Sequence, residues 1–281
     1  MVELNINFNP KPEDVERLVE IQYNFLNSEY NELIIYFNKT TFINAAVFVV
    51  LGTLCVYSNY INKTVKFKFK DEENSCIYKF MNQVGFYNFF MKSNCAIIGK
   101  NAIPFNCIAN EDKMEEYTNK ILELAPIIME EEAKDILSSY FFEIYQNAFY
   151  HANSPIDVFS SGYWMPNKKS LIFSIYDMGI GIPKNVRTYL NKQMNSRECI
   201  EWALAEGMST IEDKLIKRGL GLSRLEKFIK LNNGTISIYT DNICCTIDKN
   251  CRNFTELSTP IMGTLMIINI IADTEHIYIV S

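Results

Sequence analysis

The chain has 281 residues, of which 48% are hydrophobic and 21% charged, a balance that is typical of packed domains and argues against extended disorder. The formal net charge of −6 excludes an overall basic field that would attract nucleic acid or an anionic membrane surface. Eight cysteines without a C-x-x-C pair, together with only two histidines, disfavour structural zinc and are typical of reduced thiols in a cytosolic protein.

The N-terminal residues contain no basic segment followed by an apolar one, so we expect no secretory signal. The longest apolar run covers residues 45–57 and falls short of the about 20 residues that span a bilayer. We therefore expect a cytoplasmic protein without a membrane partner, in which this run forms a buried helix.

The first hundred residues alternate between helical and extended patterns. A helix is predicted from Pro12, a favourable first-turn residue, and its apolar periodicity runs through Val15, Leu18, Val19, Gln22 and Phe25. After it we expect a strand at 32–37, the buried helix at 45–57, a strand at 64–70, a helix at 73–84 that Gly85 ends, and a strand at 95–100. This order predicts a small α/β domain.

The apolar periodicity is lost between residues 99 and 112, around Pro104 and several Asn residues. We therefore divide the chain into a domain at 1–105 and a second domain at 106–281. In the second domain the patterns predict helices at 111–125, 130–152 and 223–234, a polar and mostly helical segment at 184–217, and strands at 171–177, 235–240, 243–248, 263–270 and 276–280. Successive strands near the end favour an antiparallel sheet, so the expected fold class is an α/β chain.

The segment EIYQNAFYHA begins at Glu143 and has the pattern of a helix. Glu143 and Asn147 stand four residues apart, which places a carboxylate and an amide oxygen on one helix face, one turn apart. Such a pair could hold Mg²⁺ through Asn147 and orient or deprotonate a water through Glu143. Taken alone, this pair would be unremarkable.

The segment DMGIGIP begins at Asp177, where an alternating strand gives way to a turn. A carboxylate at a strand end can accept a hydrogen bond from an exocyclic amine, and Gly179 and Gly181 leave room for a flat base against the backbone. Adenine fits this description. The same residues also describe an ordinary loop, which is the simpler interpretation of this segment in isolation.

The segment RGLGL covers residues 218–222 at the start of a predicted helix. Free backbone N–H groups and the positive end of the helix dipole suit phosphate oxygens there, and Arg218 could add charge. The alternative is that the glycines only let a loop turn into a helix. The combination of three such segments favours a nucleotide pocket with an adenine end and a phosphate end.

These three segments and the later Gly263-Thr264 resemble, in order and spacing, the N box, the two glycine boxes and the final Gly-Thr motif of the GHKL ATPases. That superfamily includes DNA gyrase B subunits, heat-shock chaperones, MutL proteins, sensor histidine kinases and anti-sigma-factor kinases. The resemblance covers about residues 112–272. It implies a Bergerat fold, an α/β (α+β) sandwich that binds ATP or ADP with Mg²⁺ beneath a mobile lid, here residues 184–217.

The resemblance also implies roles for single residues. Asn147 would hold the metal, and Asp177, supported by Thr264, would bind the adenine amine, while Glu143 stays the candidate catalytic base from its place one turn before Asn147. The remaining nucleotide-binding positions would be Gly179, Gly181, Ile182, Arg218, Gly219, Leu220, Gly221 and Leu222. Residues 30–95 resemble, more weakly, the STAS-related domain that precedes such ATPases in some bacterial proteins, through element order and the segment FMNQVGF before Tyr87.

Three functions follow as hypotheses. The first is an ATP-binding, slowly hydrolysing, Mg-dependent regulatory switch whose lid movement is coupled to the N-terminal domain or to a regulatory protein partner. The alternatives are a serine/threonine protein kinase resembling the anti-sigma-factor kinases and a non-catalytic nucleotide-binding scaffold. A self-phosphorylating sensor kinase is not expected, because His151 lies inside the first motif and His276 in a predicted strand rather than on a dimerisation helix.

Overall fold

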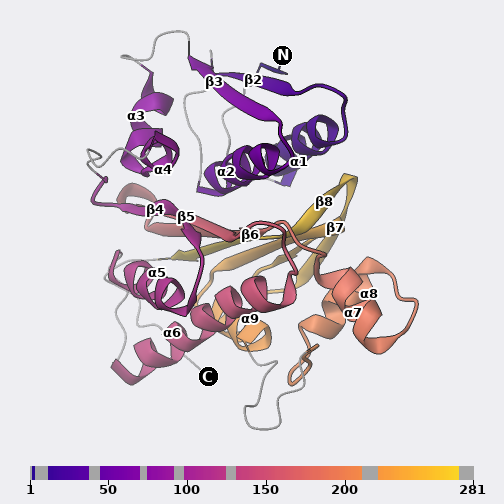
Figure 1. Ribbon diagram of the computed structural model, residues 1–281. Coiled ribbons are helices and arrows are strands. Elements are labelled where there is room, and N and C mark those ends of the chain that lie inside the picture. The colour runs from indigo at the N-terminus through magenta and orange to yellow at the C-terminus, as the bar shows by residue number, and fades with distance from the viewer. Residues whose placement is uncertain are drawn as a thin grey trace.

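The computed structural model combines helices with two β-sheets (Figure 1). It describes residues 2–3, 12–37, 45–69, 75–91, 98–124, 131–210 and 221–271. Over these residues, no helix combines the length and the apolar character that crossing a bilayer would require. The predicted mixture of helix and sheet is confirmed in this coarse form, as an α+β fold with one parallel and one antiparallel sheet.

The smaller sheet is parallel and is built from the N-terminal part of the chain. Its strands, in the spatial order β1-β2-β3, are β1 (Val2–Glu3), β2 (Glu32–Phe37) and β3 (Thr64–Phe69). Parallel neighbours require a crossover, and helices α1 (Pro12–Leu26) and α2 (Ala45–Tyr60) provide the two crossovers. The predicted helix from Pro12, the two strands and the buried helix are therefore confirmed.

Helix α2 lies between the two sheets (Figure 1). It packs against β3 of the small sheet on one side and against β5 and β6 of the larger sheet on the other. Residues 46–51 are all buried. Because α2 has apolar neighbours on both sides, it needs no polar face, and this explains an apolar run without helical periodicity.

Two short helices connect the sheets. Helix α3 (Cys76–Gln83) begins after Ser75, whose side chain accepts a hydrogen bond from the Tyr78 N–H at 3.2 Å, and Gly85 with a φ of 71° follows its end. Helix α4 (Phe86–Met91) follows and was not predicted. Residues 98–100 are not extended, so the strand predicted at 95–100 was wrong for its described part, while 95–97 lie outside the described residues.

The larger sheet is antiparallel, in the spatial order β4-β5-β6-β8-β7. Its strands are β4 (Ala102–Ile108), β5 (Val158–Met165), β6 (Ser170–Asp177), β7 (Thr235–Ile247) and β8 (Arg252–Ile271). Strand β4 occupies the stretch expected to be irregular, so that expectation was wrong, and the division between residues 105 and 106 falls inside this strand. Pro104 is accommodated because β4 is an edge strand whose register with β5 shifts between Ile103 and Asn106.

Three further differences concern strands. Strand β5 was not predicted. The separate strands expected at 235–240 and 243–248 are one strand, β7, with irregular pairing around Asp241, which has a φ of 53°. Strand β8 begins at Arg252 and not near residue 263. The last predicted strand, at 276–280, lies outside the described residues.

The larger sheet is covered on both faces. Helices α5 (Glu111–Leu124), α6 (Glu131–Gln146) and α9 (Gly221–Leu231) cover one face, and α1 and α2 cover the other (Figure 1). The two faces of β6 therefore contribute to different cores. Phe173 and Ile175 pack toward α6, whereas Ile172 and Tyr176 pack toward α1 and α2. Helices α7 (Ile182–Leu190) and α8 (Ser196–Ala203) lie beyond one end of the sheet.

Candidate functional site

A pocket lies where the end of β6 meets the end of α6 and helices α7 and α8. Its volume is about 100 Å³, several times the roughly 10–15 Å³ that one water requires. Seven of the predicted site residues line it, namely Glu143, Asn147, Asp177, Gly181, Ile182, Leu222 and Thr264. Arg218, Gly219 and Leu220 lie outside the described residues. The tertiary structure thus brings together residues that are more than a hundred positions apart in sequence.

Asp177 is the last residue of β6 and pairs in register with Thr264 of β8. Its side chain is 3% exposed, and one carboxylate oxygen accepts the Gly179 backbone N–H at 2.9 Å. Burial raises the pKa of the Asp177 carboxyl to about 7, although backbone hydrogen bonds from Gly179 and Thr264 act in the opposite direction. A buried carboxyl that lines a pocket can accept a hydrogen bond from a ligand donor.

This raised pKa predicts a measurable pH dependence of folding. The folded chain holds the Asp177 proton more tightly than the unfolded chain, where the pKa is near the ordinary value of about 3.8. The stabilisation that this proton provides is complete below pH 4 and is lost as the pH rises through about 7. We expect wild type to lose up to about 4 kcal/mol relative to Asp177→Asn between pH 4 and 8, at about 1.4 kcal/mol per pKa unit. Urea unfolding of both proteins across this range measures the difference, and parallel curves would contradict the assignment.

The glycine turn after Asp177 rests directly on the end of the preceding helical segment. The Ile180 N–H donates to the Ala152 carbonyl oxygen at 2.7 Å. A Cβ on Gly179 would lie 2.7 Å from the Ala152 Cβ and closer still to its carbonyl oxygen, so no side chain fits there. Gly179 does not line this pocket. A glycine is required at position 179 because the two backbones approach closely there.

Thr240 of β7 joins this turn to the Gly263-Thr264 segment and was missed in the sequence. Its hydroxyl oxygen accepts the Ile182 N–H at 3.2 Å and donates to the Gly263 carbonyl oxygen at 2.9 Å. Gly181 has a φ of 75°, and a Cβ on it would lie 2.8 Å from the Thr240 hydroxyl. The only sequence signal for Thr240 was its place in an alternating strand, which carries no information about this contact.

Glu143 and Asn147 meet the pocket from one helical face, as their spacing predicts. Asn147 begins a π-helical segment (Asn147–His151) that continues α6, and such widened turns are frequent at functional sites. A Cβ on Gly221, the first residue of α9, would lie 2.5 Å from the Glu143 carboxyl carbon. The start of α9 therefore touches Glu143, and the first and third motifs are in contact.

The donor atoms at this position suit Mg²⁺ only together with a ligand. Within the described ranges, no group of three or more His, Cys, Asp or Glu side chains is arranged to hold a metal ion. Mg²⁺ prefers oxygen ligands and is usually held by one or two protein groups plus phosphate oxygens and water. Asn147 offers one such oxygen, and Glu143 could orient a water beside it, which fits a metal that arrives with a phosphorylated ligand.

Helix α9 is fixed to the sheet by a buried carboxylate. Glu226 is 4% exposed and accepts hydrogen bonds from Arg252 at 2.6 and 2.7 Å. It also forms an ion pair with Lys230 at 2.7 Å. Burial acts to raise the pKa of Glu226, but the two cations hold it below its ordinary value. Because Arg252 begins β8, this cluster ties the helix that carries Gly221 and Leu222 to the strand that carries Thr264.

Removal of Arg252 should therefore loosen α9. We expect Arg252→Ala to lower the free energy of unfolding by about 3 kcal/mol, because it leaves a buried carboxylate with only the partly exposed Lys230. The matched control is Lys227→Ala on α9, which removes an ion pair to Glu206 in which the lysine side chain is 49% exposed, and it should cost below about 1 kcal/mol. Chemical denaturation at pH 7 measures both, and equal losses would show that the Glu226 cluster does not fix α9.

The far wall of the pocket comes from residues that the sequence did not single out. They are Asn185, Trp202, Met208, Ser209 and Thr210, from α7, α8 and the segment after α8. The Asn185 amide donates to the Thr210 hydroxyl at 3.0 Å, which joins α7 to this segment. The predicted lid at 184–217 is thus described up to residue 210, and this part does face the pocket.

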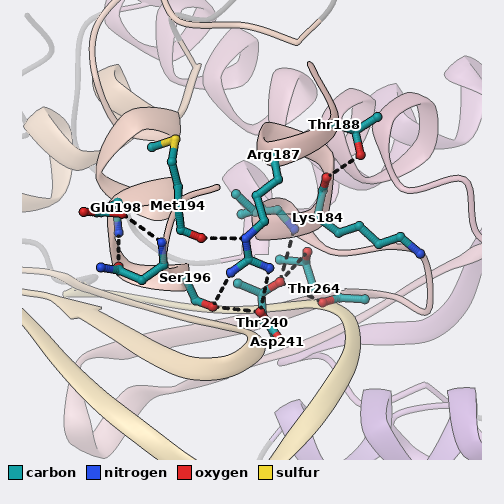
Figure 2. A network of polar contacts seen from close by, with 12 residues as sticks. Lys184, Arg187, Thr188, Met194, Ser196, Glu198, Thr240, Asp241 and Thr264 are labelled. Carbon is teal, nitrogen blue, oxygen red and sulfur yellow. Dashed lines mark hydrogen bonds and ion pairs between the residues drawn. The ribbon is translucent and has the colours of Figure 1, made fainter. Parts of the chain in front are cut away.

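Figure 2 shows what holds this region to the sheet. The Arg187 guanidinium donates to the Met194 carbonyl oxygen at 2.7 Å, to the Ser196 hydroxyl at 3.0 Å and to Asp241 at 3.3 Å, and Ser196 donates to Asp241 at 2.7 Å. One arginine therefore connects α7, the start of α8 and β7. Helices α7 and α8, which line the pocket, are therefore positioned against the sheet by side-chain contacts.

Comparisons with protein-family models, with curated proteins and with solved structures each gave no match for this chain. The case for a ligand site accordingly rests on the residues and geometry described above.

Proposed function

We propose that the chain binds ATP or ADP together with Mg²⁺ and acts as a slowly hydrolysing regulatory switch of the GHKL type. The observation that carries the proposal is the buried Asp177 carboxyl in a pocket that Asn147, Glu143 and Leu222 also line. The Asp177 carboxyl would accept a hydrogen bond from the adenine amine. Asn147, Glu143 and Leu222 would contact the metal, its water and the phosphates. In this proposal, bound Mg²⁺ neutralises charge on the phosphate oxygens.

We further propose that the larger sheet with α5, α6 and α9 is a Bergerat-type ATPase domain and that the smaller sheet with its crossover helices is a STAS-like unit. The antiparallel order β4-β5-β6-β8-β7, with helices on one face and the pocket at the end of β6, supports the first assignment. The parallel β1-β2-β3 sheet supports the second. Contacts of α1 and α2 with the larger sheet give a route by which ligand state reaches the N-terminal unit or a protein partner.

Calorimetric titration of the full chain tests the binding step. We expect ATP to bind more tightly than GTP. We also expect Asn147→Ala to weaken ATP binding in the presence of Mg²⁺ about tenfold or more, a loss of about 1.4 kcal/mol or more in binding free energy. Asn59→Ala, an exposed amide on α2, is the matched control and should bind like wild type. Absence of nucleotide binding by the folded wild-type chain would overturn the proposal.

The hydrolysis step needs a separate variant. Glu143→Gln keeps the shape that Gly221 packs against, so it should still bind ATP. Turnover should fall about 100-fold or more if Glu143 activates the attacking water. Phosphate release measured under saturating ATP gives this ratio. If wild type hydrolyses ATP, unchanged turnover in a variant that binds normally would show that Glu143 is not the base. If wild type binds ATP without turnover, the result favours the scaffold alternative.

A further inference from the structure

A buried glutamine on the first helix contacts the two residues that flank Asp177. Gln22 is 3% exposed, although it stands on the apolar face of α1. Its amide oxygen accepts the Tyr176 hydroxyl proton at 3.1 Å, and its amide nitrogen donates to the Met178 sulfur at 3.6 Å. Buried polar groups are costly unless they are hydrogen-bonded, so this side chain needs both partners.

Tyr176 precedes Asp177 in β6 and points to the opposite face because side chains alternate along a strand, and Met178, which follows the strand, is buried on that same side. Both belong to the core that α1 and α2 form with the sheet, whereas Asp177, between them, faces the pocket. Gln22 therefore forms hydrogen bonds with the residues before and after Asp177, on the face of the sheet opposite the pocket. A displacement of this end of α1 would displace the backbone that carries the Asp177 carboxyl.

The packing around Gln22 makes this polar contact important. A cavity of about 340 Å³ adjoins it, lined by residues of α1, α2 and β8 that include Tyr23, Leu26 and Met262. The end of α1 is held to the segment after α2 by Lys63, whose ammonium donates to the Phe25, Leu26 and Ser28 carbonyl oxygens at 2.9, 3.2 and 2.6 Å. Beside the cavity, the hydrogen bonds of Gln22 supply the directional contact between α1 and the residues around Asp177.

We propose that Gln22 is a positioning residue that sets the Asp177 carboxyl from the opposite side of the sheet, so that docking of helix α1 and recognition of the adenine base are coupled. The inference rests on the proposed function for the identity of the ligand, but its structural part concerns Asp177 alone. Coupling of this kind is reciprocal: a ligand held by Asp177 favours the docked α1 by the same free energy by which docked α1 favours the ligand.

The test compares two substitutions on the same helix. Gln22→Met keeps the length and burial of the side chain and removes its hydrogen bonds. The Tyr176 hydroxyl retains an acceptor in the Met262 carbonyl oxygen at 3.0 Å, so the variant should fold. Glu16→Ala is the matched control, since it removes the 2.6 Å hydrogen bond from the Ser258 N–H to α1 without touching the neighbours of Asp177. Tyr176→Phe removes the same link from the other partner and serves as the second variant.

Two measurements on the full chain decide the outcome. The first is the titration of the Asp177 carboxyl by carbon-detected NMR without nucleotide, and the second is the affinity for ATP and GTP by calorimetry. We expect Gln22→Met and Tyr176→Phe to displace the titration midpoint and to weaken ATP about fivefold or more, the lower end of typical coupling between sites, with a reduced preference over GTP. Glu16→Ala should match wild type in both.

The inference is overturned if Gln22→Met titrates and binds like wild type, or if Glu16→Ala produces the same changes, because loosening of α1 in general would then explain them. Failure of the proposed function has a different signature. If the folded wild-type chain binds no ATP, the ATP proposal fails, and the Asp177 titration alone still accepts or rejects the role of Gln22.

Discussion

Asp177→Asn should lose about 100-fold or more in affinity for ATP while the chain remains folded. The Gly179 N–H and the Thr264 backbone hold the acceptor side of residue 177, so the asparagine oxygen would take that position. The new amide nitrogen would then face the pocket and oppose the donor amine of adenine. An unsatisfied buried polar pair costs about 1–3 kcal/mol, and each 1.4 kcal/mol is a factor of ten. Calorimetric titration with ATP at pH 8 measures the loss.

The same geometry predicts a change of base preference, which a damaged fold would not produce. Guanine presents a carbonyl oxygen where adenine presents an amine, so the variant should favour GTP relative to ATP compared with wild type. Asp135→Asn, an exposed aspartate on α6, is the matched control and should leave both affinities unchanged. Wild-type affinity for ATP in Asp177→Asn would show that this carboxyl does not recognise the base.

Gly263→Ala should be among the most destabilising single substitutions in the chain. Gly263 lies in β8 with a φ of 76°, and a Cβ there would be 2.7 Å from the Gly179 nitrogen and closer still to the Asp177 carbonyl oxygen. Both neighbours are backbone atoms of the turn that forms the pocket, so neither can rotate away. We expect a loss of about 3 kcal/mol or more, from the left-handed conformation and from overpacking together. Chemical denaturation measures it.

Gly207→Ala separates these two causes. Gly207 has a φ of 78°, close to that of Gly263, but a Cβ on it would meet no atom within 4 Å. Its substitution should therefore cost only the conformational part, about 1–2 kcal/mol. If both variants lost the same free energy, close approach of the backbones at Gly263 would play no part, and the packing described for the Asp177 turn would be incorrect.

Local patterns predicted the regular elements well where one physical signal dominated. The apolar face of α1 and the alternation in β6 identified a helix and a strand close to their observed bounds. Prediction was wrong at Pro104, because a residue that usually ends a strand is tolerated at a sheet edge, and edge position is decided by partners distant in sequence. Two strands were similarly predicted where one strand, β7, continues through a local irregularity at Asp241 because it stays paired with β8.

For the pocket, too, the sequence predicted some features and the tertiary structure decided others. The sequence by itself determined which candidate residues would lie together: the four-residue spacing of Glu143 and Asn147 predicted their common face, and Asp177 was assigned to the end of its strand. Only the tertiary structure decided the rest of the pocket and its supports. Thr240, Asn185 and Gln22 act through partners 23 to 156 residues away in sequence, the largest separation being that of Gln22 and Met178. Periodicity reports the local backbone, whereas contacts between distant segments depend on how the sheets and helices pack, which no short sequence window contains.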